Sequence, residues 1–247
     1  MTISVITLFP NVFNPLLESS ILAKAQKEGK LRVKLIDLRD FGIGSRKQID
    51  DRPYGGGVGM ILRVDVIAKA IKKTEGKRQA KTILLTPQGK TFNQRMAQRL
   101  SKRKHLILIC GHYEGVDERV RKLVDEEISI GDYILSGGEV AAMVVLDTIT
   151  RLLPGVLDKE AIQKESFSKW KMENGKWKIL LEPPQYSRPE EFEGMKVPKV
   201  LLSGNHQKIE EWRSREALKK TKRRRPDLLN ARVTSREPVV RNNTSNY

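Results

Sequence analysis

The sequence predicts an α/β fold, and three observations support that prediction. Short apolar runs alternate with amphipathic stretches through the first part of the chain. The 247 residues are 38% apolar and 31% charged, a composition typical of a globular protein with a sizeable core. Glycine-containing loops directly follow two of the apolar runs, where the strands of an open sheet would end.

The predicted elements follow in order along residues 1–156, which we interpret as one domain. Short apolar runs predict strands at Ile3–Leu8, Leu31–Leu38, Thr82–Leu85 and Leu106–Cys110. Helical spacing of apolar residues predicts helices at Asn14–Gln26, Val64–Lys73, Asn93–Leu100, Asp117–Val124 and Val140–Leu153. A turn-rich segment, Arg39–Gly59, separates the second strand from the second helix, and Pro154-Gly155 ends the last helix.

The chain changes character after Gly155. Residues 157–184 are polar and basic with few periodic apolar positions, so we interpret them as an interdomain linker of the kind that is disordered on its own. Residues 185–230 predict a small helical domain whose main helix begins near Ser203-Gly204-Asn205 and ends before Pro226. Residues 231–247 predict a flexible tail.

The net charge of +17 makes nucleic acid the expected partner, against the alternative that the charge serves only solubility. Cys110 is the only cysteine, which excludes an intramolecular disulfide and a cysteine-based metal cluster. No apolar stretch approaches a membrane span, and the amino terminus lacks the basic region of a signal peptide. We therefore expect a cytoplasmic protein with no membrane association.

Three glycine-containing loops predict a ligand pocket. They are T-P-Q-G at 86–89, G-H-Y-E-G at 111–115 and the run E-I-S-I-G-D-Y-I-L-S-G-G-E at 127–139. Each alone is most simply an ordinary turn, but loops at strand ends of an α/β sheet can gather into one site. Because no phosphate-binding glycine motif is present, the pocket suits an adenine and a thioether better than a phosphate tail. The carboxylate of Glu114 could face a cationic or hydroxyl group.

A basic stripe is predicted on the helix of the carboxy-terminal domain. Lys208, Arg215, Lys219 and Lys222 recur at helical spacing, and the preceding Ser203-Gly204-Asn205 would offer backbone N–H groups to a phosphate. The alternative is a solvated helix face; the chain-wide positive charge favours RNA. Trp212 and Ile209 are expected in the core, while His112 and His206 are expected in a loop hydrogen bond and at the helix start. No metal-ligand spacing is present.

The motifs resemble those of the bacterial tRNA (guanine-N1-)-methyltransferase family TrmD. The resemblance covers roughly residues 1–230 and includes L-T-P-Q-G, G-H-Y-E-G-V-D-E-R-V, S-I-G-D-Y-I-L-S-G-G-E, R-L-L-P-G-V-L, D-D-R-P-Y-G-G-G-V-G-M, P-x-Y-S-R-P and V-P-K-V-L-L-S-G-N-H. It implies a SPOUT-type parallel sheet flanked by helices with a deep trefoil knot, and a homodimer whose active sites lie between subunits. It also implies that S-adenosylmethionine binds in the knot. The implied cofactor contacts are Leu84, Leu85, Thr86, Pro87, Gln88, Gly89, Gly111, Tyr113, Glu114, Ser129, Ile130, Gly131, Asp132, Tyr133, Ile134, Leu135, Gly137 and Gly138.

The resemblance further implies methyl transfer to N1 of the guanosine at tRNA position 37, beside the anticodon. Glu165 stands where the family has an aspartate base, and Glu182 replaces a second linker aspartate that the resemblance assigns to tRNA. Arg151 matches the arginine that contacts the guanine. Considered without the resemblance, Glu165 is most simply a solvated charge, and Arg151 a helix-end cation. Ala141 stands where relatives usually have proline.

Two alternatives stay open at this point. One is a SPOUT methyltransferase that acts on another RNA or nucleotide, and the other is a non-catalytic RNA-binding protein that keeps the cofactor pocket. The Glu165 replacement favours the second alternative, whereas Arg151 and the intact glycine loops favour the enzyme. The sequence does not indicate whether Mg²⁺ assists.

Overall fold

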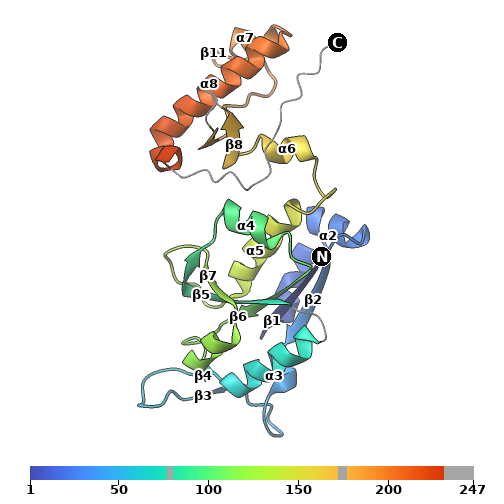
Figure 1. The fold of residues 1–247 in the computed structure, drawn as a ribbon, viewed down its shortest axis with the longest axis vertical. Helices are drawn as coiled ribbons and strands as arrows, with labels where there is room; N and C mark the ends of the chain where they lie inside the picture. Colours follow the sequence, from blue (N-terminus) through green and yellow to red (C-terminus); the bar gives the residue numbers. More distant parts are fainter. Residues whose placement is uncertain (77–79, 172–176, 231–247) are drawn as a thin grey trace. The chain divides into compact units, whose positions relative to one another are not determined.

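The computed structural model describes residues 1–76, 80–171 and 177–230, and the chain divides into two compact units (Figure 1). The first unit is Met1–Leu157, and the second begins at Asp158. The predicted tail at 231–247 lies outside the described residues. Within the described part, no helix is both long and apolar enough to cross a membrane.

The first unit is built on a five-stranded parallel sheet with the order β2-β1-β6-β5-β7, as the predicted α/β fold requires. Its strands are β1 (Thr2–Thr7), β2 (Arg32–Asp37), β3 (Asp50–Asp51), β4 (Ile61–Leu62), β5 (Lys81–Thr91), β6 (His105–Cys110) and β7 (Glu126–Ser129). Its α-helices are α1 (Asn14–Leu17), α2 (Ser20–Lys27), α3 (Val64–Glu75), α4 (Gln94–Leu100) and α5 (Glu139–Arg151), and its 3-10 helices are η1 (Pro10–Phe13), η2 (Leu38–Phe41) and η3 (Glu118–Leu123). The short strands β3 and β4 pair separately from the main sheet.

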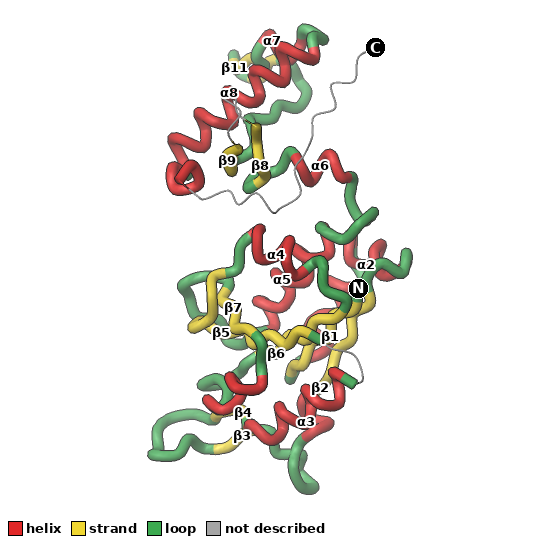
Figure 2. The backbone as a smooth tube through the Cα atoms, in the orientation of Figure 1, coloured by secondary structure: helices red, strands yellow, loops and turns green. Residues whose placement is uncertain are grey.

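Helices cover both faces of this sheet (Figure 2). On one face, Ile3 and Val5 pack in a core with residues of α2, α4 and α5. On the other face, Ile6 and Ile109 pack with residues of α3. Because both faces are covered, the inner strands are apolar without alternation, which explains why β1 and β6 could be identified as strands in the sequence.

Two predicted helices differ from the structure. The helix predicted at Asn14–Gln26 is divided into α1 and α2, because Ser20 has φ +47° and a right-handed helix cannot continue through a positive φ. The helix predicted at Asp117–Val124 is instead the 3-10 helix η3, capped by the Asp117 side chain, which accepts a hydrogen bond from the Arg119 N–H.

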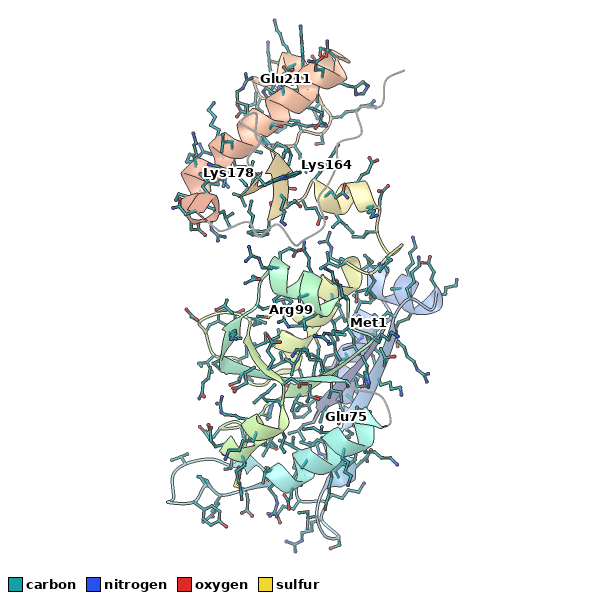
Figure 3. All side chains as sticks on the ribbon, in the orientation of Figure 1. Met1, Glu75, Arg99, Lys164, Lys178 and Glu211 are labelled. Atoms are coloured by element: carbon teal, nitrogen blue, oxygen red, sulfur yellow. The ribbon has the colours of Figure 1, made fainter. Side chains whose placement is uncertain are left out.

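The second unit combines short strands with one long helix. Its elements are α6 (Lys159–Gln163), β8 (Ser168–Lys171), β9 (Trp177–Leu180), β10 (Glu191–Phe192), β11 (Met195–Lys196), α7 (Lys199–Leu202), α8 (His206–Arg224) and the 3-10 helix η4 (Pro226–Asn230). The segment predicted as a linker therefore contains α6 and the antiparallel pair β8–β9. Figure 3 shows Lys164, beyond the end of α6, and Lys178 of β9, both in this unit.

Candidate functional site

A pocket of about 300 Å³ lies at the carboxyl ends of β5, β6 and β7. This is the edge of an open α/β sheet where ligands usually bind. The three predicted loops all contribute to its wall. Its lining residues are Leu84, Leu85, Thr86, Pro87, Gly111, His112, Tyr113, Glu114, Gly115, Val116, Ile128, Ser129, Ile130, Gly131, Tyr133, Ile134, Leu135, Ser136, Gly137, Gly138 and Ala141.

The part of the pocket wall that β5 supplies is an extended strand rather than a tight turn. The strand runs from Lys81 to Thr91 through T-P-Q-G, and its register against β7 shifts between Leu85 and Lys90. The shift leaves Thr86 and Pro87 at the pocket. Beyond it, a Cβ on Gly89 would lie 2.4 Å from the Ile128 backbone nitrogen, so only glycine permits this approach of β5 to β7.

The glycines of the 127–139 run allow equally close packing. A Cβ on Gly138 would lie 2.7 Å from Cys110 Cα, and the Gly138 N–H donates to the Gly111 carbonyl at 2.8 Å. Gly131 has φ +153°, and its Cβ would meet the Tyr133 ring at 2.4 Å. The predicted loop begins later than expected, because residues up to Ser129 belong to β7.

Internal hydrogen bonds hold this loop in shape. Ser129 Oγ donates to the Gly131 carbonyl at 3.0 Å and accepts from the Gly131 N–H at 3.2 Å. The Tyr133 hydroxyl donates to the Ile130 carbonyl at 3.3 Å. The polar groups of the turn are therefore paired locally, and the apolar side chains of Ile130 and Leu135 pack against the core.

The pocket gathers all but three of the predicted cofactor contacts. Gln88 and Gly89 line a neighbouring pocket instead, where the Gln88 side chain contacts Arg121, and Asp132 is exposed outside the wall. The residues that the prediction omitted are His112, Gly115, Val116, Ile128, Ser136 and Ala141. Each of these lies within one of the three motifs or within two residues of it, so closeness to a motif was the signal that could have identified them.

The mouth of the pocket is bordered by the glycine-rich segment before β4. A Cβ on Gly59 would lie 2.5 Å from Glu114 Cγ, and the Glu114 N–H donates to the Met60 carbonyl at 3.1 Å. Tyr54 and Val58, in the same segment, are almost fully exposed. The motif D-D-R-P-Y-G-G-G-V-G-M thus lies next to the pocket, although the sequence placed it only in a turn-rich connection.

Arg151 and Glu165 belong to different units. Arg151 is the last residue of α5 and is partly buried. Glu165 is also partly buried and lies in the turn between α6 and β8, where its carbonyl accepts from the Ser168 N–H at 3.2 Å. The roles of these two side chains at the guanine stay predictions.

Glu165 and Glu182 stand where the family pattern has aspartate, and the segments that contain them lie side by side. The Glu182 N–H donates to Ser166 Oγ at 3.2 Å, and the Phe167 N–H donates to the Leu180 carbonyl at 2.8 Å. The Glu182 side chain accepts from Gln185 Nε2 at 3.3 Å. The turn that contains Glu165 is therefore fixed to the strand end that precedes Glu182.

The basic stripe is exposed on α8, as its spacing predicted. Lys208, Arg215, Lys219 and Lys222 all have exposed side chains, and Lys219 Nζ lies 3.6 Å from Glu216 Oε1. Two of the backbone donors expected to be free are engaged, because the Ser203 N–H donates to the Val200 carbonyl and the Asn205 N–H to Ser203 Oγ.

The first turn of α8 is stabilised by an N-cap residue. Asn205 caps α8 by accepting from the Lys208 N–H at 3.0 Å, and His206 is the first helical residue. Trp212 and Ile209 are only partly buried, which places them at the edge of a small core. Within residues 1–76, 80–171 and 177–230, no cluster of three or more histidine, cysteine or acidic side chains could hold a metal ion.

Comparison with known proteins matches this chain over residues 1–231 to the family described as tRNA (Guanine-1)-methyltransferase TrmD. A tRNA (guanine-N(1)-)-methyltransferase of Carboxydothermus hydrogenoformans is 52% identical over 242 residues, covering 97% of this chain and 92% of that protein. The protein of the same name from Geobacillus kaustophilus is 53% identical over 232 residues, covering 93% of this chain and 91% of its own length. The one from Clostridium perfringens is 47% identical over 240 residues, with 97% and 98% covered.

Proposed function

This chain belongs to the tRNA (guanine-1)-methyltransferase family TrmD, and on that premise we propose that it transfers a methyl group from S-adenosylmethionine to N1 of guanosine 37 in tRNA. The observation that carries the proposal is the pocket, which gathers three glycine loops at the carboxyl edge of the sheet. The site of action is proposed to be the cytoplasm.

The pocket residues suit this cofactor. The volume of about 300 Å³ is at the lower end of the range for small-molecule sites. Leu85, Ile130 and Leu135 offer apolar walls for the adenine, while Gly111 and Gly137 allow the backbone to approach it closely. The bound cofactor would supply a methyl group on a positively charged sulfur, a group that is already activated for transfer.

The chain then has to make N1 of guanine nucleophilic, because N1 is protonated at neutral pH. We assign Glu165 as the general base that accepts the N1 proton, and Arg151 as the cation that stabilises negative charge on O6. Glu165 is one methylene longer than the aspartate of the family pattern and keeps the same carboxylate chemistry. The remaining contribution is positioning of N1 in line with the methyl group.

A homodimer is part of this proposal. Val140 and Val144 are exposed on α5, and Phe9 and Val12 are exposed at the adjacent η1. Exposed apolar side chains on neighbouring elements of a charged protein are typical of an interface. The surface supports pairing with a second copy, so that Glu165 of one chain could serve a pocket of the other.

A trefoil knot is also proposed for the first unit. Supporting it are two close backbone approaches, Gly89 against Ile128 and Gly138 against Cys110, which bring successive chain segments past each other without side chains between them. The basic stripe on α8 is proposed to bind the tRNA backbone, because exposed cations at helical spacing can follow a row of phosphates.

The decisive experiment is methyl transfer by the purified full chain. Labelled S-adenosylmethionine is incubated with unmodified tRNA transcripts that contain either guanine or adenine at position 37, and the product nucleoside is identified by mass spectrometry. We expect 1-methylguanosine only with the guanine transcript. Label on both transcripts would favour another RNA target, and cofactor binding without transfer would favour a non-catalytic role.

The base assignment has its own test. Glu165→Gln should lower the transfer rate about 100-fold or more while the cofactor Kd stays within about twofold, because only proton acceptance is removed. Glu160→Gln, an exposed position on α6, is the matched control and should keep full activity. A Glu165→Gln variant with near-normal turnover would show that another group takes the proton.

A further inference from the structure

A buried carboxylate lies directly beneath the pocket wall and has no part in the proposed methyl transfer. Glu139, the first residue of α5, is 7% exposed. Its Oε1 accepts a hydrogen bond from Thr7 Oγ1 at 2.7 Å, at the carboxyl end of β1. A buried carboxylate is stable only where a cation or hydrogen-bond donors compensate for lost hydration, and a threonine hydroxyl satisfies one oxygen.

The second oxygen of Glu139 faces His112. The distance from Glu139 Oε2 to His112 Nδ1 is 3.9 Å. His112 Nδ1 is itself buried and has no hydrogen-bond partner in the described part of the chain. The imidazole ring lies between Phe9, at a centroid distance of 5.0 Å, and Tyr113, at 4.8 Å. A buried ring nitrogen thus faces an oxygen of a buried glutamate residue, and both groups would gain from pairing.

Gly137 passes between these two side chains. A Cβ at Gly137 would lie 2.4 Å from Glu139 Oε2 and 2.5 Å from His112 Nδ1. The backbones of His112 and Gly137 form a β-bridge, and the next residue, Gly138, bonds to Gly111. His112, Gly137 and Gly138 all line the pocket. A His112–Glu139 pair therefore connects two of the three loops that form the pocket.

We propose that the His112 Nδ1–H donates to Glu139 Oε2 and that this pair positions the 111–115 and 137–138 loops, so that affinity for the cofactor depends on it. The identity of the ligand rests on the proposed function. The pair needs only an imidazole that carries its proton on Nδ1, because a carboxylate accepts a hydrogen bond from that N–H. Removal of either side chain should therefore loosen both loops and weaken cofactor binding.

Other ionisable groups lie around the pair. Cys110 precedes the loop, Tyr113 and Glu114 follow His112, and the Arg39 guanidinium stacks over Phe9 at 5.4 Å. Burial, followed by the charge of Glu139, raises the pKa of the Cys110 thiol well above its ordinary value, so this thiol stays neutral at neutral pH. The other groups are common to the wild-type chain and the variants below.

The first test measures binding of S-adenosylhomocysteine by calorimetry to the wild-type chain, His112→Asn, Glu139→Gln and the double variant. We expect each single variant to bind roughly tenfold more weakly than the wild-type chain, and the double variant no more weakly than either, as for coupled residues. Additive losses, or wild-type affinity in either single variant, would overturn the proposal.

The second test needs no cofactor and so separates this proposal from the proposed function. Hydrogen exchange measures the protection of the Gly138 amide, which bonds to Gly111 across the two loops. After correction for intrinsic exchange, protection should be several-fold lower in His112→Asn and in Glu139→Gln than in the wild-type chain. Wild-type protection in either variant would contradict the pairing. Failure of the wild-type chain to bind S-adenosylhomocysteine would contradict only the cofactor assignment.

Discussion

The two units of this protein are stabilised and used in different ways. The first unit buries most of its apolar side chains on both faces of a parallel sheet, and its pocket is lined by glycine-containing loops and apolar side chains. In the described part of the second unit, only Leu180, Pro183, Ala217 and Thr221 are buried, and its long helix α8 exposes a row of cations. The first unit should therefore be sensitive to added volume, and the second to lost polar contacts and lost charge.

The largest effect is expected for Gly138→Ala in the first unit. The added Cβ would lie 2.7 Å from Cys110 Cα, and this backbone cannot move without displacing the end of β6. Overpacking of this kind costs about 1–3 kcal/mol, so cofactor affinity should fall roughly tenfold to hundredfold. Calorimetry with S-adenosylhomocysteine measures the loss.

The control for this substitution is Gly111→Ala. The nearest atom to a Cβ there is Val116 Cγ1 at 3.7 Å, an ordinary van der Waals contact, so the fold should keep its thermal stability. Equal affinity of Gly138→Ala and the wild-type chain would show that the crossing of these loops is more adaptable than its geometry indicates.

A matched pair of threonine substitutions compares the two units directly. Thr221 Oγ1 donates to the Ala217 carbonyl at 2.7 Å and accepts from the Leu181 N–H at 2.9 Å, so it links α8 to the segment after β9. Thr221→Val should destabilise the second unit by about 1–3 kcal/mol, because the Leu181 N–H loses its partner. Chemical denaturation monitored by tryptophan fluorescence reports on this unit, since all three tryptophans belong to it.

Thr150→Val is the matched substitution in the first unit. Thr150 is fully buried like Thr221, and its hydroxyl donates to the Leu146 carbonyl within its own helix. A carbonyl of a helix keeps its backbone bond when the hydroxyl is removed, so we expect a change below about 1 kcal/mol. Similar losses for both variants would contradict the view that Thr221 links two separate segments.

Charge removal in the second unit should have a moderate effect. Lys219→Ala should weaken tRNA binding about threefold to tenfold and reduce the slope of log Kd against log salt by about one, as expected for one lost phosphate contact. The bridge to Glu216 is exposed and contributes little to folding, so stability should be unchanged. Lys24→Ala, an exposed cation of the first unit, should leave the slope as it is.

The smallest effect is expected at a surface ion pair of the first unit. Arg99 (labelled in Figure 3) contacts Glu126 Oε1 at 2.6 Å, and Lys81 lies 3.4 Å from Oε2. Burial alone would raise the pKa of the Glu126 carboxyl, but Arg99 and then Lys81 outweigh it and lower that pKa. Because the folded-state pKa is below the unfolded one, the stabilisation is full above the unfolded pKa and is lost as pH falls through the folded pKa.

Arg99→Ala should accordingly reduce the free energy of unfolding by about 0.5–1 kcal/mol at neutral pH, a value discounted for the exposure of Arg99. The difference from the wild-type chain should shrink in acid. Urea denaturation at neutral and acidic pH measures both values, with the exposed Lys102→Ala as control. A loss that is constant with pH would assign the effect to packing of the arginine stem.

Much of the pocket could be predicted because its residues come in short motifs at strand ends. Almost all glycines and apolar residues of those motifs line one cavity, so their presence in the motifs was enough to predict it. The exceptions show where the sequence is insufficient. Gln88 and Gly89 lie in the same motif as Pro87, yet β5 continues in extended form and directs them to a neighbouring pocket.

The second unit was less predictable for a physical reason. The segment predicted as a linker contains α6 and the β8–β9 pair, and these elements are held by hydrogen bonds from distant residues, including Thr221. Such contacts give no periodic apolar pattern in the sequence. The long helix α8, by contrast, is marked by its capping asparagine and by the proline after it, and its predicted extent is close to the observed one.

The sequence by itself determined the α/β class, the strand-end loops and the positive charge, because local apolar patterns and glycine positions follow from short-range geometry. Only the tertiary structure decided which loops meet. It placed His112 against Glu139, residues 27 positions apart in the chain, with Thr7 of a third segment on the opposite side. Such a pairing depends on the order of strands in the sheet, which brings the ends of β1, β6 and the start of α5 together.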